Sequence, residues 1–210
     1  YFGLVMIFYG IIYALLENDI RRILAYSIVN QVGFMLVGIG IGTQLSINGA
    51  ITHAFAHIIY KALLLMSAGS VIYMTQKRRC TDVGGLYRTM PITTICGIIG
   101  ALAISSFPLT SGFTTKSMIV SGAAYEHLFY VWILLVAASA GVFLHAGIKF
   151  PWFVFFQKDS GLRPKEPPKN MLLAMVLLSF LCVLFGIFPN LLYQLLPFDK
   201  LYIPYTSDHV

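Results

Sequence analysis

Residues 53–61 read HAFAHIIYK and lie inside an apolar stretch that runs from about residue 49 to residue 74. Such a stretch can cross the hydrocarbon core of a membrane, which requires about 20 helical residues. It nevertheless carries three proton-binding side chains, His53, His57 and Lys61, at intervals of four residues. On a helix these positions form one stripe. The stretch therefore predicts a transmembrane helix with an ionisable face, and such faces mark ion or proton pathways.

The composition of the whole chain also indicates lipid rather than water as its solvent. Of 210 residues, 58% are hydrophobic and only 10% are charged, whereas soluble domains carry about 25% charged residues. We predict an all-α, polytopic membrane protein. The net charge of +6 comes from clusters in predicted loops, which we interpret as signals of membrane topology and not as a surface for nucleic acid.

Six transmembrane helices are expected. Their approximate ranges are 1–16, 23–42, 49–74, 92–125, 128–148 and 171–196. Together they form a predicted helical bundle over residues 1–196, followed by an outward-facing tail over residues 197–210. Because the chain opens with YFGLVMIFYG, without an initiator methionine, and stops at PYTSDHV, we expect it to be a piece of a longer protein.

Positive charges divide the predicted loops into two sides. Loops 17–22, 75–91 and 149–170 hold the basic residues Arg21, Arg22, Lys77, Arg78, Arg79, Arg88, Lys149, Lys158, Arg163, Lys165 and Lys169. The other side holds only Lys200, in the tail. By the positive-inside rule, the first side is expected to face the cytoplasm and both ends of the chain to face outward. Two cations, Lys61 and Lys116, remain within the predicted helices.

The fourth predicted helix is too long for a single membrane crossing. Residues 92–125 would extend about 51 Å as a continuous helix, and their centre reads SSFPLTSGFTTKSM over residues 105–118. Pro108 removes a backbone donor, and Gly112 lowers helix propensity further. We predict a helix that is discontinuous at Pro108, a device found at ion sites of transporters, with Lys116 at the site. The alternative is a kinked helix whose lysine extends outward to the membrane surface.

The stripe at residues 53–61 is suited to carrying protons. Imidazole titrates near pH 6.5, and successive sites about 6 Å apart allow proton transfer through one bridging water. Lys61 lies too far from either end of its helix to reach the surface. Two alternatives stay open for the histidines: hydrogen-bonded packing, or ligation of a metal or haem, for which only His145, near a predicted helix end, offers a partner. Asn30 and Gln31 either continue the polar axis or bind a neighbouring helix.

Three motifs occur in a fixed order along the chain. They are NDIRRILAYSIVNQVGFM at residues 18–35, HAFAHIIYKALLLMSAGSVI at residues 53–72, and FPLTSGFTTKSMI at residues 107–119. This pattern resembles the antiporter-like subunits shared by respiratory complex I, membrane-bound hydrogenases and multisubunit Mrp-type cation/proton antiporters. The resemblance implies about fourteen transmembrane helices in two inverted repeats, of which the six here would be the ninth to the fourteenth.

The resemblance also implies roles for particular residues. The family's proton relay falls on His53, His57 and Lys61, and the lysine of its second broken helix falls on Lys116, the terminal site of the outward half-channel. At Arg21 many relatives have lysine; because arginine does not release its proton, anchoring at the membrane interface is the expected role there. The family's first half-channel lies upstream of this chain.

As a function, the resemblance implies a proton-translocating subunit of a sodium/proton antiporter, most like the D-type subunit of Mrp antiporters. It would work in the inner (plasma) membrane with other membrane subunits, lipid, protons and monovalent cations, and without a cofactor or metal. The first alternative is a proton-pumping subunit of a redox-driven complex such as NADH:quinone oxidoreductase or a hydrogenase. A weaker alternative is a structural or haem-anchoring membrane protein.

Overall fold

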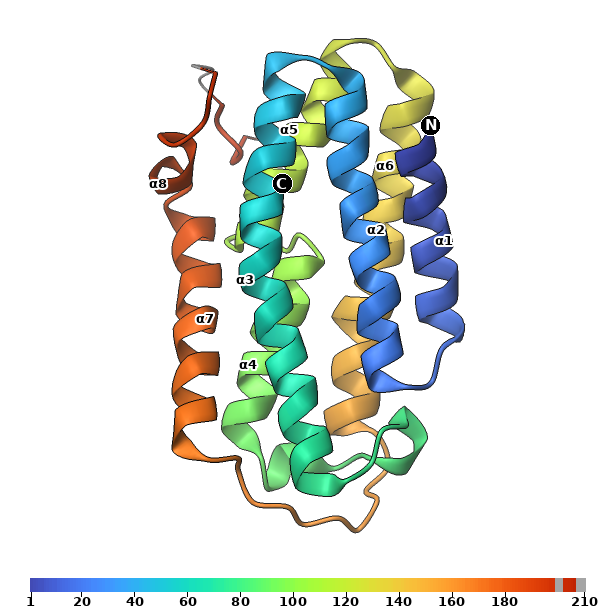
Figure 1. The fold of residues 1–210 in the computed structure, drawn as a ribbon, viewed down its shortest axis with the longest axis vertical. Helices are drawn as coiled ribbons and strands as arrows, with labels where there is room; N and C mark the ends of the chain where they lie inside the picture. The colour runs from blue at the N-terminus through green and yellow to red at the C-terminus, as the bar shows by residue number, and fades with distance from the viewer. Residues whose placement is uncertain (199–201, 207–210) are drawn as a thin grey trace.

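The computed structural model describes residues 1–198 and 202–206, and this part of the chain is almost entirely helical (Figure 1). Lys200 therefore lies outside the described residues. The helices are α1 Phe2–Leu16, α2 Ile20–Ile41, α3 Gln44–Thr75, α4 Pro91–Ile104, α5 Ser111–Tyr125, α6 Phe129–Val142, α7 Lys169–Ile187 and α8 Asn190–Tyr193. Two π-helical segments, η3 Phe143–Lys149 and η4 Trp152–Phe156, follow α6, and two short 3-10 turns, η1 Cys80–Asp82 and η2 Leu86–Arg88, lie between α3 and α4.

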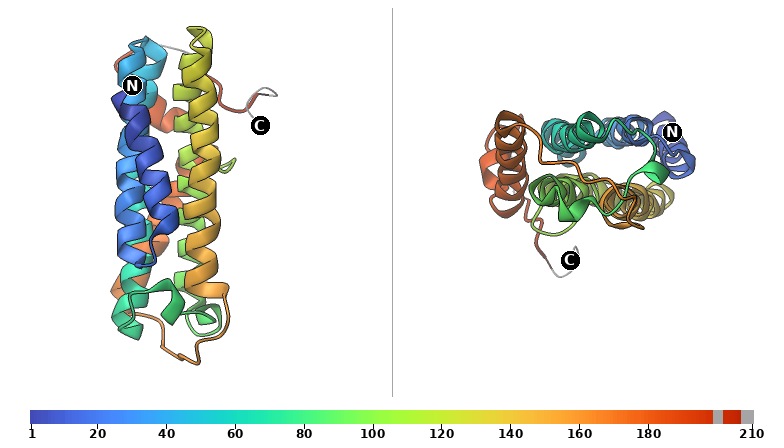
Figure 2. Two further views of the ribbon diagram at one scale, coloured as in Figure 1. Left: turned by 90° about the vertical axis from the view of Figure 1, so that its right-hand side faces the viewer. Right: turned by 90° about the horizontal axis from the view of Figure 1, so that it is seen from below.

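The long helices run side by side along the long axis of the molecule. Seen along that axis, α1, α2 and α3 form one layer, α6 and the pair α4–α5 form a second, and α7 packs at one side (Figure 2). The connections at residues 17–19, 76–90 and 157–168 all lie at the same end (Figure 1). We call this the basic end, because the loop cations of the sequence gather there, and the predicted alternation of loops is thereby confirmed.

Several helices have the length and the surface of membrane spans. The segments Ile20–Ile41, Gln44–Thr75, Phe129–Phe156 and Lys169–Ile187 are long and apolar enough to cross a bilayer, and Phe2–Leu16 and Pro91–Ile104 are shorter apolar helices. Large apolar side chains such as Leu173, Leu177 and Phe180 on α7 are exposed. Lipid tails are themselves apolar, so exposing such a surface to a bilayer costs no hydrophobic free energy.

Two predicted boundaries were wrong, and a proline explains each of them. The expected loop from residue 149 is helical as far as Phe156, because the backbone widens into π-turns on both sides of Pro151 instead of ending. The last helix ends at Ile187 and not at residue 196, because Pro189 prevents its continuation, and only the short α8 follows. Because the helical segment continues to Phe156, His145 lies in its interior and not, as the sequence had indicated, near its end.

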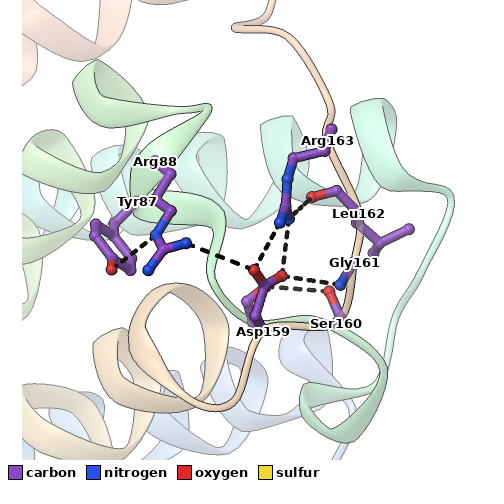
Figure 3. A network of polar contacts seen from close by, with 8 residues as sticks. Tyr87, Arg88, Asp159, Ser160, Gly161, Leu162 and Arg163 are labelled. Atoms are coloured by element: carbon purple, nitrogen blue, oxygen red, sulfur yellow. Dashed lines mark hydrogen bonds and ion pairs between the residues drawn. The ribbon is translucent and has the colours of Figure 1, made fainter.

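An ionic network joins two loops at the basic end (Figure 3). The Asp159 carboxylate binds the Arg163 guanidinium at 2.7 Å, accepts the Gly161 backbone N–H at 2.9 Å, and lies 3.9 Å from Arg88. Its hydrogen bonds from Arg163 and Gly161 hold the pKa of the Asp159 carboxyl well below its usual range. The loop before α7 is thereby tied to the turn before α4.

Side chains at the basic end also cap helices. Glu166 accepts hydrogen bonds from the backbone N–H groups of Ile92 and Thr93, at the first turn of α4. Lys149 donates to the carbonyls of Ala14, Leu15 and Glu17, where α1 ends. Cations suit the negative end of a helix dipole and satisfy carbonyls that lack a partner within the helix. Lys149 thus lies on a helical segment and has a structural role that the sequence did not indicate.

Candidate functional site: a buried polar axis

The predicted break in the fourth helix is present. Helix α4 ends at Ile104 and α5 begins at Ser111. In a continuous helix the carbonyl of Ile104 would accept the N–H of residue 108, but Pro108 has no N–H to give. The Nζ of Lys116 donates to this carbonyl at 2.7 Å, and the Lys116 side chain is buried. The kinked helix with an outward-reaching lysine is therefore incorrect, since Lys116 turns inward to the break.

Close packing holds the two half-helices at this break. A Cβ added at Gly112 would lie 1.8 Å from the carbonyl oxygen of Ala103, and one at Gly186 on α7 would lie 2.2 Å from that of Leu109. Such separations are far inside van der Waals contact, so only glycine fits at either position. The break is consequently a packed element of the bundle, and its backbone geometry fixes the position of Lys116.

His53 links three helices through both of its ring nitrogens. Its Nε2 lies 3.0 Å from Oε1 of Gln31 on α2, and its Nδ1 lies 2.9 Å from Oγ1 of Thr115 on α5. Because an amide oxygen only accepts hydrogen bonds, Nε2 must carry the proton in this arrangement. Thr115 directly precedes Lys116, so His53 on α3 and Lys116 on α5 belong to one connected polar region.

The axis continues from His53 within the first layer, towards α2 and α1. The hydroxyl of Tyr60 donates to Oε1 of Gln31 at 3.2 Å, and Nε2 of Gln31 donates to Oδ1 of Asn30 at 2.6 Å. Asn30 in turn donates to the carbonyl of Ile7 on α1 at 3.2 Å. Both roles left open for this pair are present, because Gln31 extends the axis and Asn30 binds a neighbouring helix.

His57 and Lys61 complete the stripe but have fewer partners. The rings of His53 and His57 are 6.5 Å apart between centroids, close to the spacing expected from the sequence. Nε2 of His57 and Nζ of Lys61 are both buried without a hydrogen-bond partner among the described residues. Lys61 and Lys116 lie within electrostatic reach of each other. A buried amine without a partner is costly, so the environment of Lys61 disfavours a permanent charge on its amine.

A cavity connects Lys116 to the end of the bundle opposite the basic end. It has a volume of about 1330 Å³ and lies chiefly between α5 and α6, with Lys116, Ser105 and Ser106 among its lining residues. Its lining extends to Glu126, which is exposed where α5 ends. Lys116 thus borders the space that reaches this end of the bundle, whereas Lys61 does not line it.

Sequence reasoning missed two contacts of this axis. Tyr60 is fully buried and binds Gln31 and lies 3.3 Å from His53, and the Phe34 ring lies 4.9 Å from Nζ of Lys116 in a cation–π contact. A tyrosine seven residues after His53 lies on the same helical face, which is the signal that could have identified it. The position of Phe34 depends on the packing of α2 against α5 and has no such signal.

The contacts of His53 do not fit a role as a haem or metal ligand. Both ring nitrogens of His53 are engaged, one by Gln31 and the other by Thr115, so neither is free to bind a metal. Within residues 1–198 and 202–206, no group of three or more histidine, cysteine, aspartate or glutamate side chains is arranged to hold a metal ion.

Together, the fold and the axis define a polytopic helical membrane protein with buried cations at a helix break. Residues 1–144 match the family described as NADH:quinone oxidoreductase/Mrp antiporter, TM, and the chain belongs to this family. A probable K(+)/H(+) antiporter subunit of Rhizobium meliloti is 31% identical over 89% of this chain and 19% of its own length. NADH-ubiquinone oxidoreductase chain 5 of Dictyostelium discoideum is 33% identical over 82% of this chain and 26% of its own.

A solved structure shares the arrangement of the helices. A chain of the membrane-bound sulfane sulfur reductase, an archaeal respiratory membrane complex, superposes with a TM-score of 0.86 at 34% identity, over 91% of this chain and 32% of that one. The present chain thus spans only about one fifth to one third of the length of these three similar proteins.

Proposed function

We propose that this chain forms the second half of the proton path in one membrane component of a multisubunit sodium/proton antiporter, most like the D-type subunit of Mrp antiporters. The observation that carries the proposal is the placement of Lys116. Its amine is buried at the helix break, its side chain borders the cavity, and its neighbour in the sequence, Thr115, contacts the histidine stripe. The resemblance of the chain to antiporter subunits supports the exchange of protons for a monovalent cation.

In the proposed path, protons move between Lys61 and Lys116 through His57 and His53. His53 holds one proton on Nε2, which donates a hydrogen bond to Gln31. It takes a second proton at Nδ1, beside the Thr115 hydroxyl. Release of that second proton towards Lys116 restores the neutral ring. Because the two lysines are within electrostatic reach, a proton on one raises the free energy of a proton on the other. Their alternate charging couples proton movement to the opposing ion.

Substitution of Lys116 tests this proposal in the full-length subunit within its assembled complex. In vesicles, Lys116→Ala is expected to abolish proton-coupled sodium efflux while the complex still assembles. Lys165→Ala, at an exposed lysine of the loop before α7, is the matched control and is expected to transport at the wild-type rate. Sodium efflux retained by Lys116→Ala would remove Lys116 from the path.

A second candidate function is proton pumping in a redox-driven complex. The specific observation in its favour is the likeness to an archaeal respiratory complex and to NADH-ubiquinone oxidoreductase chain 5. The two candidates differ in what drives the proton. A sodium gradient alone moves protons in vesicles that hold an antiporter, whereas a redox pump requires its electron donor and acceptor.

We further propose that the basic end faces the cytoplasm and that the protein lies in the inner (plasma) membrane with other membrane subunits. The concentration of lysine and arginine in loops at one end supports this orientation. Labelling of Lys165→Cys with a membrane-impermeant thiol reagent tests it. Inverted vesicles are expected to be labelled and intact cells to be protected.

A further inference from the structure

His145 is a buried titratable side chain that the proposed path does not use. It lies in the π-helical segment η3 and is fully buried. Single π-turns within long helices are uncommon and occur frequently at functional sites. The widened backbone gives this stretch a local geometry that the α-helical parts of Phe129–Phe156 do not have.

One hydrogen bond settles the protonation pattern of the His145 ring. Its Nδ1 lies 3.0 Å from the carbonyl oxygen of Gly141. Since a carbonyl only accepts hydrogen bonds, Nδ1 carries the proton, and Nε2 of the neutral ring carries a lone pair. That Nε2 is buried and has no hydrogen-bond partner among residues 1–198 and 202–206. The neutral ring therefore presents a free proton acceptor to the interior of the bundle.

The surroundings of this acceptor are those of the buried axis. Lys61 follows the start of α3 by 17 residues and His145 follows the start of α6 by 16, and both helices start at the end opposite the basic end (Figure 1). At 1.5 Å per residue, both side chains lie at a depth of about 25 Å. Lys61, Lys116 and Lys149 are the charged groups within electrostatic reach of His145.

The segment that carries His145 also packs against the helix break. A Cβ added at Gly147 would lie 2.6 Å from Oγ of Ser105, the residue that follows α4. The near atom belongs to a side chain, and its position shows that η3 packs directly against the residue that follows α4. Ile104, whose carbonyl accepts from Lys116, directly precedes Ser105. His145 thus lies at about the depth of Lys61, on a segment that packs against the end of α4, whose Ile104 carbonyl accepts from Lys116.

We propose that His145 is a second proton relay between Lys61 and Lys116, parallel to the histidine stripe of α3. The Lys61 ammonium gives a proton through water to Nε2 of His145, which forms the imidazolium and leaves Lys61 neutral. The same Nε2 then gives that proton to the neutral Lys116 amine. Throughout, the other proton stays on Nδ1, which donates to the Gly141 carbonyl, so the ring returns to its starting form. This inference rests on the proposed proton path, but not on which ion or redox reaction drives it.

A glutamine at this position separates a relay from a packing role. His145→Gln retains a side-chain amide that can donate to the Gly141 carbonyl, but it carries no proton that it can exchange. Because the histidine stripe of α3 remains as a parallel route, the test is made in a His57→Gln background. In vesicles that hold the assembled complex, adding His145→Gln to this background is expected to lower the proton flux driven by an imposed membrane potential by a further factor on the order of 100. His127→Gln, at the exposed turn between α5 and α6, is the matched control and is expected to leave the flux unchanged. A flux within about twofold of the His57→Gln parent after His145→Gln is added would overturn the proposal.

A spectroscopic measurement gives a readout independent of flux. With ring-labelled histidine, infrared difference spectra between high and low pH are expected to contain an imidazolium band that is missing in His145→Gln and altered in Lys61→Ala. A band unchanged by both substitutions would contradict the relay. If protons cross but a sodium gradient does not drive them, the antiporter proposal fails while the inference about His145 stands.

Discussion

The basic end and the buried axis differ in whether their charged and titratable groups have hydrogen-bond or ionic partners. At the basic end Asp159 is paired with Arg163, Glu166 caps α4, and Lys149 closes the end of α1. On the axis, within the described residues, Nζ of Lys61 and Nε2 of His57 have no hydrogen-bond partner, although both nitrogen atoms are buried. Ion pairs in exposed loops are individually weak and serve to tie segments together, whereas buried groups without partners are costly. The difference suggests that the basic end serves stability and the axis serves proton movement.

The largest effect is expected at the helix break that supports the axis. Gly112→Ala places a methyl group 1.8 Å from the Ala103 carbonyl oxygen, so the half-helices must separate. We expect little or no assembled complex after detergent extraction, as measured by size-exclusion chromatography. Gly69→Ala on α3, where an added Cβ has no neighbour within 4 Å, is the control and should assemble normally. Normal assembly of Gly112→Ala would show that the break is not rigid.

The next largest effect is expected where α2 meets the axis. Gln31→Leu removes the acceptor of both His53 and Tyr60, which leaves two buried donors unpaired at a cost of about 1–3 kcal/mol each. We expect a lower melting temperature of the complex and a slower proton flux, because His53 loses the partner that fixes its tautomer.

Gln194→Leu, at an exposed position after α8, is the matched control for this substitution. An unchanged flux in Gln31→Leu, measured on complex that has assembled, would remove Gln31 from the axis and leave it a packing role.

Lysine residues occur both at the basic end and on the buried axis. Substitution of Lys149 therefore tests the difference between these regions with the same type of side chain. Lys149→Met leaves the carbonyls at the end of α1 without their donor, for a loss of about 1–3 kcal/mol in the free energy of unfolding. We expect a melting temperature lower by a few degrees and an unchanged proton flux per assembled complex. Lys158→Met, at an exposed lysine, should change neither. Lost flux with unchanged stability would assign Lys149 to the axis.

The smallest effect is expected in the loop network. The folded-state pKa of Asp159 is lowered, so its ionised form contributes stability above its ordinary pKa of 3.8 and that contribution is lost as the pH falls further. Asp159→Asn should therefore melt slightly below wild type at neutral pH, and the difference should narrow below pH 3.8. Thermal melts across this pH range measure it, with Asp82→Asn, outside the network of Figure 3, as the control. A pH-independent difference would mean that the network acts by packing alone.

Much of the site could be predicted because its signals are local. The depth of Lys61 and the stripe with His53 follow from helical periodicity, and the break follows from the missing N–H of Pro108. Lys149 could not be assigned, because its partners are carbonyls about 130 residues away in the sequence. The end of the sixth predicted helix was wrong because Pro189 stops the helix within a long apolar run, whereas at Pro151 the helical segment continues.

What the sequence by itself determined was the membrane class, the alternation of loops and the identity of the buried cations, since these depend on hydropathy, charge and spacing along one chain. The tertiary structure alone decided which cation has a partner. Lys116 donates to the Ile104 carbonyl that Pro108 leaves without a partner, while Lys61 has no such acceptor within the described residues. It also brought His145 of η3 to the level of the axis. Such pairings depend on how separate helices pack, and the periodicity of a single helix carries no information about the neighbour that its face will meet.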